Sequence, residues 1–150
     1  MPDYPPKLAE LIADFATITD RNERVEALIE IADRFDDVRV PASVAVKPYP
    51  EENHVTYCES DAYVWAQENP DGTLKYYFDV LNPQGLSAMA IAVVIDETLS
   101  GAPLEQVAKI DSEIVFKLFG KEISMGKGQG LMGIIAMVRG AAQKHLKTTV

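Results

Sequence analysis

The spacing of apolar residues predicts helices at both ends of the chain and strands between them. Near the start, an apolar residue recurs at the interval of one helical face: Leu8, Leu11, Ile12 and Phe15. This spacing predicts a first helix over residues 7–16.

A second helix is predicted to begin directly after Asp20. Asp20 with Glu23 three positions later is typical of a capping box, in which a side chain accepts a hydrogen bond from a free backbone N–H. The helix is expected to end near Phe35. The residues expected to be buried by it are Val25, Leu28, Ile31, Ala32 and Phe35. Three prolines and several acidic residues in 36–52 then predict an extended surface connection.

The middle of the chain has the alternation that is typical of β-strands. Three strands are predicted, at residues 55–57, 62–67 and 73–80, with a turn at 69–72 before the last one. In the second strand, Tyr63 and Trp65 are expected on one face and Val64 on the other.

The last part of the chain is predicted to be helical. Asn82 and Pro83 suit the start of a strongly apolar core helix that ends at Leu99, before Gly101. Shorter helices are expected at 103–107 and from Asp111 to Gly120, and a final helix is expected to be capped by Ser124. The expected buried stripe of the final helix is Leu131, Ile134, Ile135 and Val138.

This order of elements predicts an α+β fold, with a three-stranded antiparallel sheet packed against helices. At 150 residues with 47% hydrophobic content, one domain over residues 1–150 is expected. The chain has no apolar run of about 18 residues and no signal-peptide pattern at its start, so we expect no membrane partner. A single cysteine favours a reducing, cytoplasmic setting.

The charge of the chain is unevenly distributed. Residues 1–80 hold 7 Lys and Arg against 17 Asp and Glu, a balance of −10, and residues 81–150 hold 7 against 6, a balance of +1. The sum is the net charge of −9. Because an acidic surface is repelled by phosphate backbones, nucleic acid is not an expected partner.

Cys58 is the most informative candidate for chemistry, because a lone cysteine can form neither an internal disulfide nor a multi-cysteine metal site. It lies between two predicted strands, and it is either a small buried residue or a nucleophile that acts alone. In an extended strand His54 would lie about 13 Å away, so a Cys–His pair is not expected. The glycine-rich residues 126–130 lack the order of a phosphate-binding loop; they predict a tightly packed helix start that presents Lys127.

Several segments together resemble one family. The segment Val55-x-x-Cys58-x-Ser60, followed by Val64-Trp65, resembles the signature V-x-G-C-x-S-x-V-W. Residues 78–86 and 123–131 resemble two further motifs, with Tyr57 in place of a glycine and Lys127 in place of an arginine. From about residue 8 to residue 142, the chain looks like the SufE-like sulfur-acceptor proteins of iron–sulfur cluster assembly.

The resemblance implies a SufE/IscU-like fold and a sulfur carrier that activates its partner, not a free-standing enzyme. Cys58 would take persulfide sulfur from a cysteine desulfurase, which depends on pyridoxal phosphate, and deliver it to a cluster-assembly scaffold. It implies no cofactor or metal in this chain. The residues that it implies for partner binding are Glu59, Ser60, Asp79, Lys127 and Gln129. The alternative is a protein-interaction module of the same fold that has lost sulfur transfer.

Overall fold

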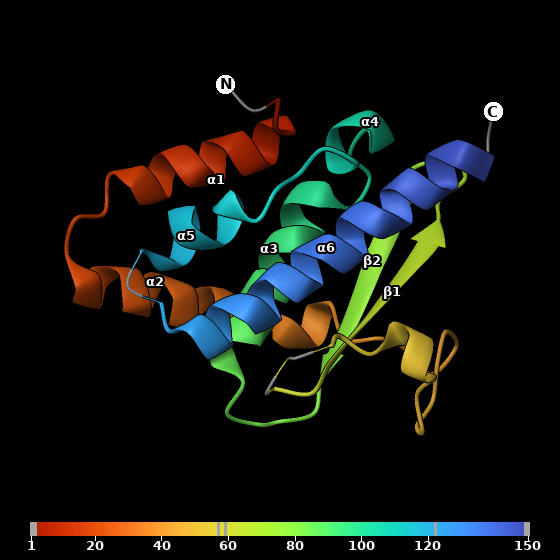
Figure 1. Ribbon diagram of the computed structural model, residues 1–150, viewed down its shortest axis with the longest axis horizontal. Helices are drawn as coiled ribbons and strands as arrows, with labels where there is room; N and C mark the ends of the chain where they lie inside the picture. Colours follow the sequence, from red (N-terminus) through yellow and green to blue (C-terminus); the bar gives the residue numbers. More distant parts are fainter. Residues whose placement is uncertain (1–2, 57, 59, 122, 149–150) are drawn as a thin grey trace.

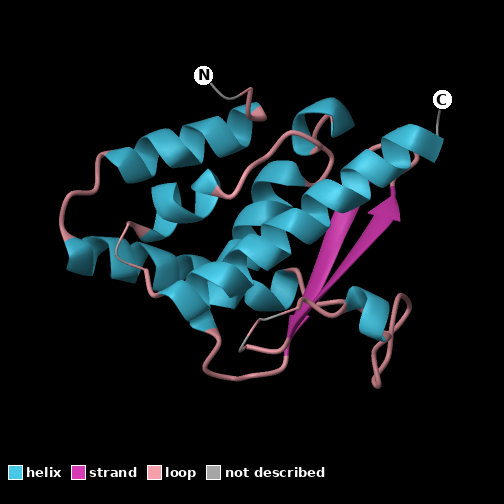
Figure 2. Ribbon diagram, in the orientation of Figure 1, coloured by secondary structure: helices cyan, strands magenta, loops and turns pink. Residues whose placement is uncertain are grey.

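The computed structural model describes residues 3–56, 58, 60–121 and 123–148. Figure 1 shows long helices surrounding a central helix, with a small sheet and an extended loop on one side. In chain order the elements are α1 (Pro6–Ala16), α2 (Arg21–Ala32), two 3₁₀ turns η1 (Phe35–Asp37) and η2 (Glu51–Asn53), β1 (Ala62–Glu68), β2 (Leu74–Val80), α3 (Leu86–Leu99), α4 (Leu104–Val107), α5 (Glu113–Phe119) and α6 (Met125–Thr148). Figure 2 shows that helices make up most of these elements.

The start of α2 confirms the predicted cap. The Asp20 side chain accepts a hydrogen bond from the Glu23 N–H, at 3.1 Å. The helix ends at Ala32, three residues earlier than predicted, and Phe35 is buried from the separate 3₁₀ turn η1. Phe35 therefore belongs to the core as expected, but the helix does not carry it there.

The sheet among the described residues has two strands, so the prediction of three strands is wrong. β1 and β2 pair antiparallel from Ala62↔Val80 to Glu68↔Leu74. The expected strand at 55–57 is reduced to one bridge between His54 and Tyr63, while Tyr57 lies outside the described residues.

The backbone at Asp61 explains why that strand does not form. Asp61 adopts a left-handed conformation with φ of +55°, and its N–H donates to the Cys58 carbonyl to close a turn. This turn reverses the chain within a few residues of the bridge, so the ladder stops after the Val55 N–H donates to the Ala62 carbonyl. On the other edge of the sheet, the segment around Arg39 pairs parallel with Phe78, which the sequence did not predict.

Different parts of the chain pack on the two faces of the sheet. Leu74, Tyr76, Phe78 and Val80 are buried under the helices, with α3 against β2 and α6 against β1. On the opposite face, the ring of Tyr49 packs edge-on against Tyr63 and Trp65. The predicted alternation in the strands is confirmed.

The core helix α3 begins at Leu86 and not at Pro83. Asn82 instead closes a turn in which its side chain accepts from the Gln84 N–H and its carbonyl accepts from the Gly85 N–H. From Ala90 to Ile95 every residue is buried, because α1, α2, α6 and β2 pack around this helix. α3 is thus the central helix that the apolar composition predicted.

The last two helices follow the prediction closely. α5 begins one residue after Ser112 and ends at Gly120, whose φ of +89° suits glycine. The Ser124 hydroxyl accepts from the Lys127 N–H at the start of α6. The predicted stripe of α6, from Leu131 to Val138, is buried. None of the helices in the described part of the chain is both long and apolar enough to cross a bilayer.

Candidate functional site

Cys58 lies in a tight loop between η2 and β1 and is partly buried against the core. Backbone hydrogen bonds hold this loop. The Val55 N–H donates to the Ala62 carbonyl, the Asp61 N–H to the Cys58 carbonyl, and the Asn82 N–H to the Ser60 carbonyl. The thiol is therefore neither sealed in the core nor carried on a free loop.

Glycines on neighbouring elements let this loop approach closely. A β-carbon built at Gly130 of α6 would lie 3.3 Å from both the Cα and the Sγ of Cys58. At Gly133 it would lie 2.9 Å from a methyl group of Val55, and at Gly85 it would lie 2.8 Å from the Cβ and Oγ of Ser60. The tightly packed helix start predicted from the glycine-rich stretch is confirmed, and what packs on it is the cysteine loop.

A cleft of about 900 Å³ opens beside the thiol. Cys58 and Ser60 line it together with residues of α2, the start of α3, the end of α5 and the first two turns of α6. The cleft thus brings together elements from both halves of the sequence. Its size is within the range of ordinary ligand sites in proteins.

α2 contributes one complete helical face to this cleft. The lining residues of the helix are Arg21, Arg24, Val25, Leu28 and Ile29, which follow the i, i+3, i+4, i+7, i+8 spacing. The prediction that Val25 is buried in the core is wrong, because 46% of its surface is exposed, and Ile29 is 41% exposed. Leu28 is half-buried, so only the C-terminal part of the predicted stripe enters the core.

Among the residues that the structure describes, the charged side chains lining the cleft are all basic. Arg21 and Arg24 come from α2, Lys121 comes from the segment before α6, and Lys127 comes from the first turn of α6. No Asp or Glu among the described residues lines it, although the chain carries a net charge of −9. The described lining of the cleft therefore carries positive charge, whereas the chain as a whole is acidic.

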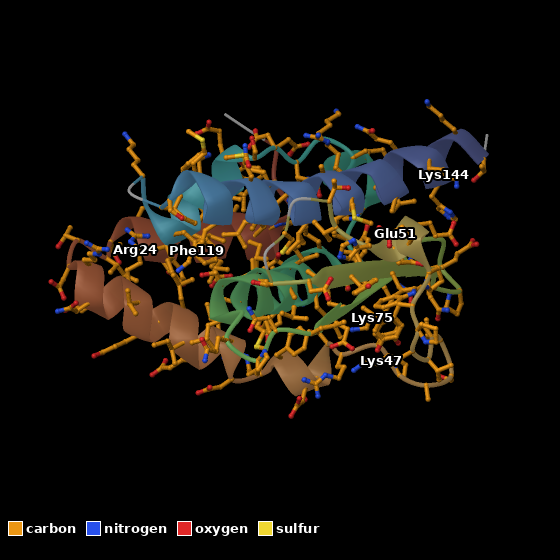
Figure 3. The ribbon with its side chains drawn as sticks, turned by 60° about the horizontal axis from the view of Figure 1, so that its bottom comes forward. Arg24, Lys47, Glu51, Lys75, Phe119 and Lys144 are labelled. Atoms are coloured by element: carbon orange, nitrogen blue, oxygen red, sulfur yellow. The ribbon has the colours of Figure 1, made fainter. Side chains whose placement is uncertain are left out.

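Arg24 also holds two helix ends in place. Its guanidinium donates to the carbonyls of Lys117 and Leu118 at the end of α5, to that of Phe15 in the last turn of α1, and to that of Ile18 just after α1. Figure 3 shows Arg24 next to Phe119, between α2 and the beginning of α6. This arginine is therefore structural as well as a source of positive charge at the cleft.

The structure brings together some of the predicted site residues and separates others. Ser60 and the exposed Lys127 line the same cleft as Cys58. Gln129 is exposed on α6 but is not part of the lining, and Glu59 lies outside the described residues. Asp79 lines a second, smaller hollow that Cys58 does not share.

Asp79 has a structural environment of its own. It is 5% exposed and accepts a hydrogen bond of 2.6 Å from the Tyr49 hydroxyl, while the Arg39 Nε lies 3.7 Å away. Burial, and then this hydrogen bond, raise the pKa of Tyr49 from 10.0 to about 12. Asp79 thus fixes Tyr49 over the outer face of the sheet, and its role in partner binding stays a prediction.

His54 is engaged away from the thiol. Its Nε2 lies 2.6 Å from the Asp61 carboxylate and its Nδ1 lies 3.2 Å from Glu51. With both ring nitrogens occupied by carboxylates, His54 is not placed as a base for Cys58. In the described ranges there is also no group of three or more His, Cys, Asp or Glu side chains that could hold a metal.

Sequence reasoning missed the basic residues on the α2 side. Arg21 and Arg24 have the same periodicity as Val25 and Ile29, so the helix carries one mixed apolar and basic face. The spacing of these residues along α2 is the sequence feature from which the basic face could have been predicted. Lys121 follows α5, and no pattern in the sequence indicates that it lines the cleft.

Comparison with known proteins decides the family of this fold. The family described as "SufE: Fe-S metabolism associated domain" matches residues 9–142. The chain belongs to the SufE family. A similar solved structure is the solution structure of a hypothetical protein from Thermus thermophilus, with 21% identity and a TM-score of 0.74 over 96% of this chain and 98% of that one. That likeness confirms the α+β fold, and no curated protein matches this SufE-family chain.

Membership connects the protein with iron–sulfur metabolism. In this SufE-family fold, the cysteine loop, the glycines of α6 and the basic cleft form one continuous region.

Proposed function

We propose that this protein is a sulfur acceptor that takes persulfide sulfur from a cysteine desulfurase onto Cys58. It then delivers the sulfur for iron–sulfur cluster assembly, and it stimulates the desulfurase by removing the sulfur. The observation that carries the proposal is the position of Cys58, partly exposed at a cleft and packed on Gly130 of α6. A thiol kept only for core packing does not need an open cleft beside it.

The proposed reaction is an exchange between a thiol and a persulfide. The Cys58 thiolate attacks the terminal sulfur of the donor's Cys–S–SH, a new S–S bond forms on Cys58, and the donor's S–S bond breaks. The donor cysteine leaves as a thiolate and takes up the proton that Cys58 gave up. One thiol and one persulfide enter, and one of each leaves, so the step requires no oxidant or reductant.

A single cysteine suits this cargo. A second thiol nearby would attack the inner sulfur of Cys58–S–SH, form a disulfide and release the sulfur as sulfide. The chain has one cysteine in 150 residues, so an internal reaction of this kind cannot occur. We infer that the protein acts in the cytoplasm, where thiols stay reduced.

Ser60 and Lys127 are the residues proposed to assist. Both line the cleft with Cys58, and the positive charge of Lys127 favours an anionic sulfur there. We propose that Lys127 and Ser60 contact the donor or the bound persulfide. Glu59 and Gln129 are also proposed to contact the partner protein.

The direct test is a mass measurement. The protein is mixed with cysteine, pyridoxal phosphate and the cysteine desulfurase of the same organism, and its intact mass is recorded without reductant. The wild type is expected to gain one sulfur atom that dithiothreitol removes, and Cys58→Ser is expected to gain none. Equal gain by Cys58→Ser, or no gain by the wild type, would refute the proposal.

The alternative is an interaction module of the same fold without sulfur transfer. The observation that favours it is Tyr57, which stands where the family signature has glycine next to the cysteine. The interaction-module hypothesis predicts that Cys58→Ala changes neither the affinity for the desulfurase nor the rate of cysteine turnover. Sulfur acceptance predicts that the same substitution abolishes the stimulation of turnover.

A further inference from the structure

We propose that the basic cleft docks an acidic segment of the desulfurase, a segment that carries carboxylates next to an apolar side chain. This proposal rests on the proposed function, since it names the partner chemistry that brings a sulfur donor to Cys58. It concerns recognition and not the transfer step. The two can therefore fail separately.

The first argument is the exposed apolar surface. The exposed large hydrophobic residues in the described part of the chain are Val25, Ile29, Val46, Leu86 and Met125. Three of these five line the cleft, and Met125 lies between the lining residues Ser124 and Gly126. Because monomeric proteins rarely gather such residues on one surface, this concentration favours a protein partner over a small polar ligand.

The second argument is the separation of charge on α2. Arg21 and Arg24 occupy the face toward the cleft, whereas Glu23, Glu26 and Glu30 lie on the remaining faces and do not line it. The helix is therefore sorted by sign, with its basic residues toward the thiol. A partner segment with negative charge is attracted to this side and repelled by the others.

The third argument is the arrangement of the basic residues around the apolar ones. Arg21 and Arg24 come from α2, Lys121 comes from the segment between α5 and α6, and Lys127 comes from the first turn of α6. Lys121 and Lys127 make no ion pair within the residues that the structure describes, and both are exposed. These basic residues and the exposed apolar residues Val25, Ile29 and Leu86, which we call the apolar floor of the cleft, fit a segment that carries an apolar residue next to carboxylates.

The test measures binding of the desulfurase holoenzyme of the same organism at low and high salt. The cleft variant is Lys121→Glu with Lys127→Glu. The control is Lys109→Glu with Lys144→Glu, which makes the same change in net charge at two exposed lysines outside the cleft, one of them near the far end of α6 (Figure 3). We expect the cleft variant to bind about tenfold more weakly at low salt, and the difference to shrink at high salt, because salt screens exposed charges. The control is expected to stay within about twofold of the wild type.

A second pair of variants tests the apolar floor. Val25→Ser with Ile29→Ser removes exposed apolar surface from the cleft, whereas Val46→Ser removes it elsewhere. Because all three residues are exposed, we expect the variants to fold like the wild type. Circular dichroism checks this. The floor variant is expected to bind more weakly than the Val46 control at every salt concentration.

Two outcomes separate this proposal from the proposed function. If the wild type gains sulfur but the cleft variants bind like their controls, the docking proposal is overturned and sulfur acceptance stands. If binding depends on the cleft charges but the wild type gains no sulfur, docking stands and sulfur acceptance falls.

Discussion

Cys58 rests directly on the backbone of α6 at Gly130, with so little space between them that a β-carbon at position 130 would lie 3.3 Å from the thiol sulfur. This contact joins a loop before β1 to a helix that begins more than sixty residues later in the chain. The position of the thiol is thus set by α6 as much as by its own loop.

Gly130→Ala is expected to move the thiol without unfolding the protein. The loop must shift by a few tenths of an ångström, and we expect sulfur uptake to slow by about threefold to tenfold, since transfer depends on the placement of the reacting atoms. The matched control is Gly140→Ala on the same helix, where a β-carbon meets no atom within 4 Å.

Alanine has a higher helix propensity than glycine, so both substitutions stabilise α6 in this respect. Gly140→Ala is expected to raise the free energy of unfolding by about 0.5–1 kcal/mol without changing the rate of sulfur uptake. Uptake by Gly130→Ala at the rate of Gly140→Ala, measured by intact mass over time, would show that the contact does not position the thiol.

Arg24→Lys is expected to lower the free energy of unfolding by about 2 kcal/mol, measured by urea titration. An ammonium group cannot reach the carbonyls after α1 and at the end of α5 as the guanidinium does. Arg139→Lys is the comparison, because within the described ranges Arg139 donates to a single carbonyl, that of Ile110. A similar loss for both variants would mean that the link between helix ends contributes little.

The left-handed backbone at Asp61 predicts an order of stability among its variants. Asp61→Ala should be less stable than Asp61→Gly by about 1 kcal/mol, because glycine adopts a φ of +55° without a steric penalty. Both substitutions remove the contact with His54, so their difference isolates the backbone conformation. Thermal unfolding compares them, and equal stability would contradict the conformational argument.

The raised pKa of Tyr49 predicts a loss of stability in alkali. Burial and the hydrogen bond to Asp79 favour the neutral phenol of the folded protein, whose pKa rises from 10.0 to about 12. Below pH 10.0 this contribution is complete, and it is lost as the pH rises toward 12, because the unfolded chain then releases a proton that the folded chain keeps.

The stability advantage of the wild type over Tyr49→Phe should therefore shrink across this range of pH in urea titrations. A constant difference would show that Tyr49 ionises equally in both states.

Local features of the fold were predictable from the sequence, because neighbouring residues determine them. The Asp20 cap and the buried stripe of α6 are examples. The absence of the third strand was not predictable, since alternation at 55–57 gives no indication that Asp61 turns the backbone back after a single bridge. Pairing with a distant strand depends on such turns.

The candidate site was predictable in part. The family signature pointed to Cys58, Ser60 and Lys127, which line one cleft. The apolar stripe of α2 was assigned wholly to the core, because periodicity shows that a helix has an apolar face but not what covers it. Val25 shows that part of this face is left for the cleft.

The bridge between His54 and Tyr63 and the Val55 bond to Ala62 limit how far this thiol can travel. Cys58 is three residues from Val55, and an extended chain spans at most about 3.6 Å per residue, so the Cα of Cys58 stays within about 11 Å of the Val55 Cα at the base of the loop. The sulfur atom reaches beyond this only by the length of one side chain. A donor whose persulfide is recessed further than this below its own surface is out of reach. In the proposed reaction, the depth of the donor's persulfide, and not its chemistry alone, would decide whether Cys58 can accept its sulfur.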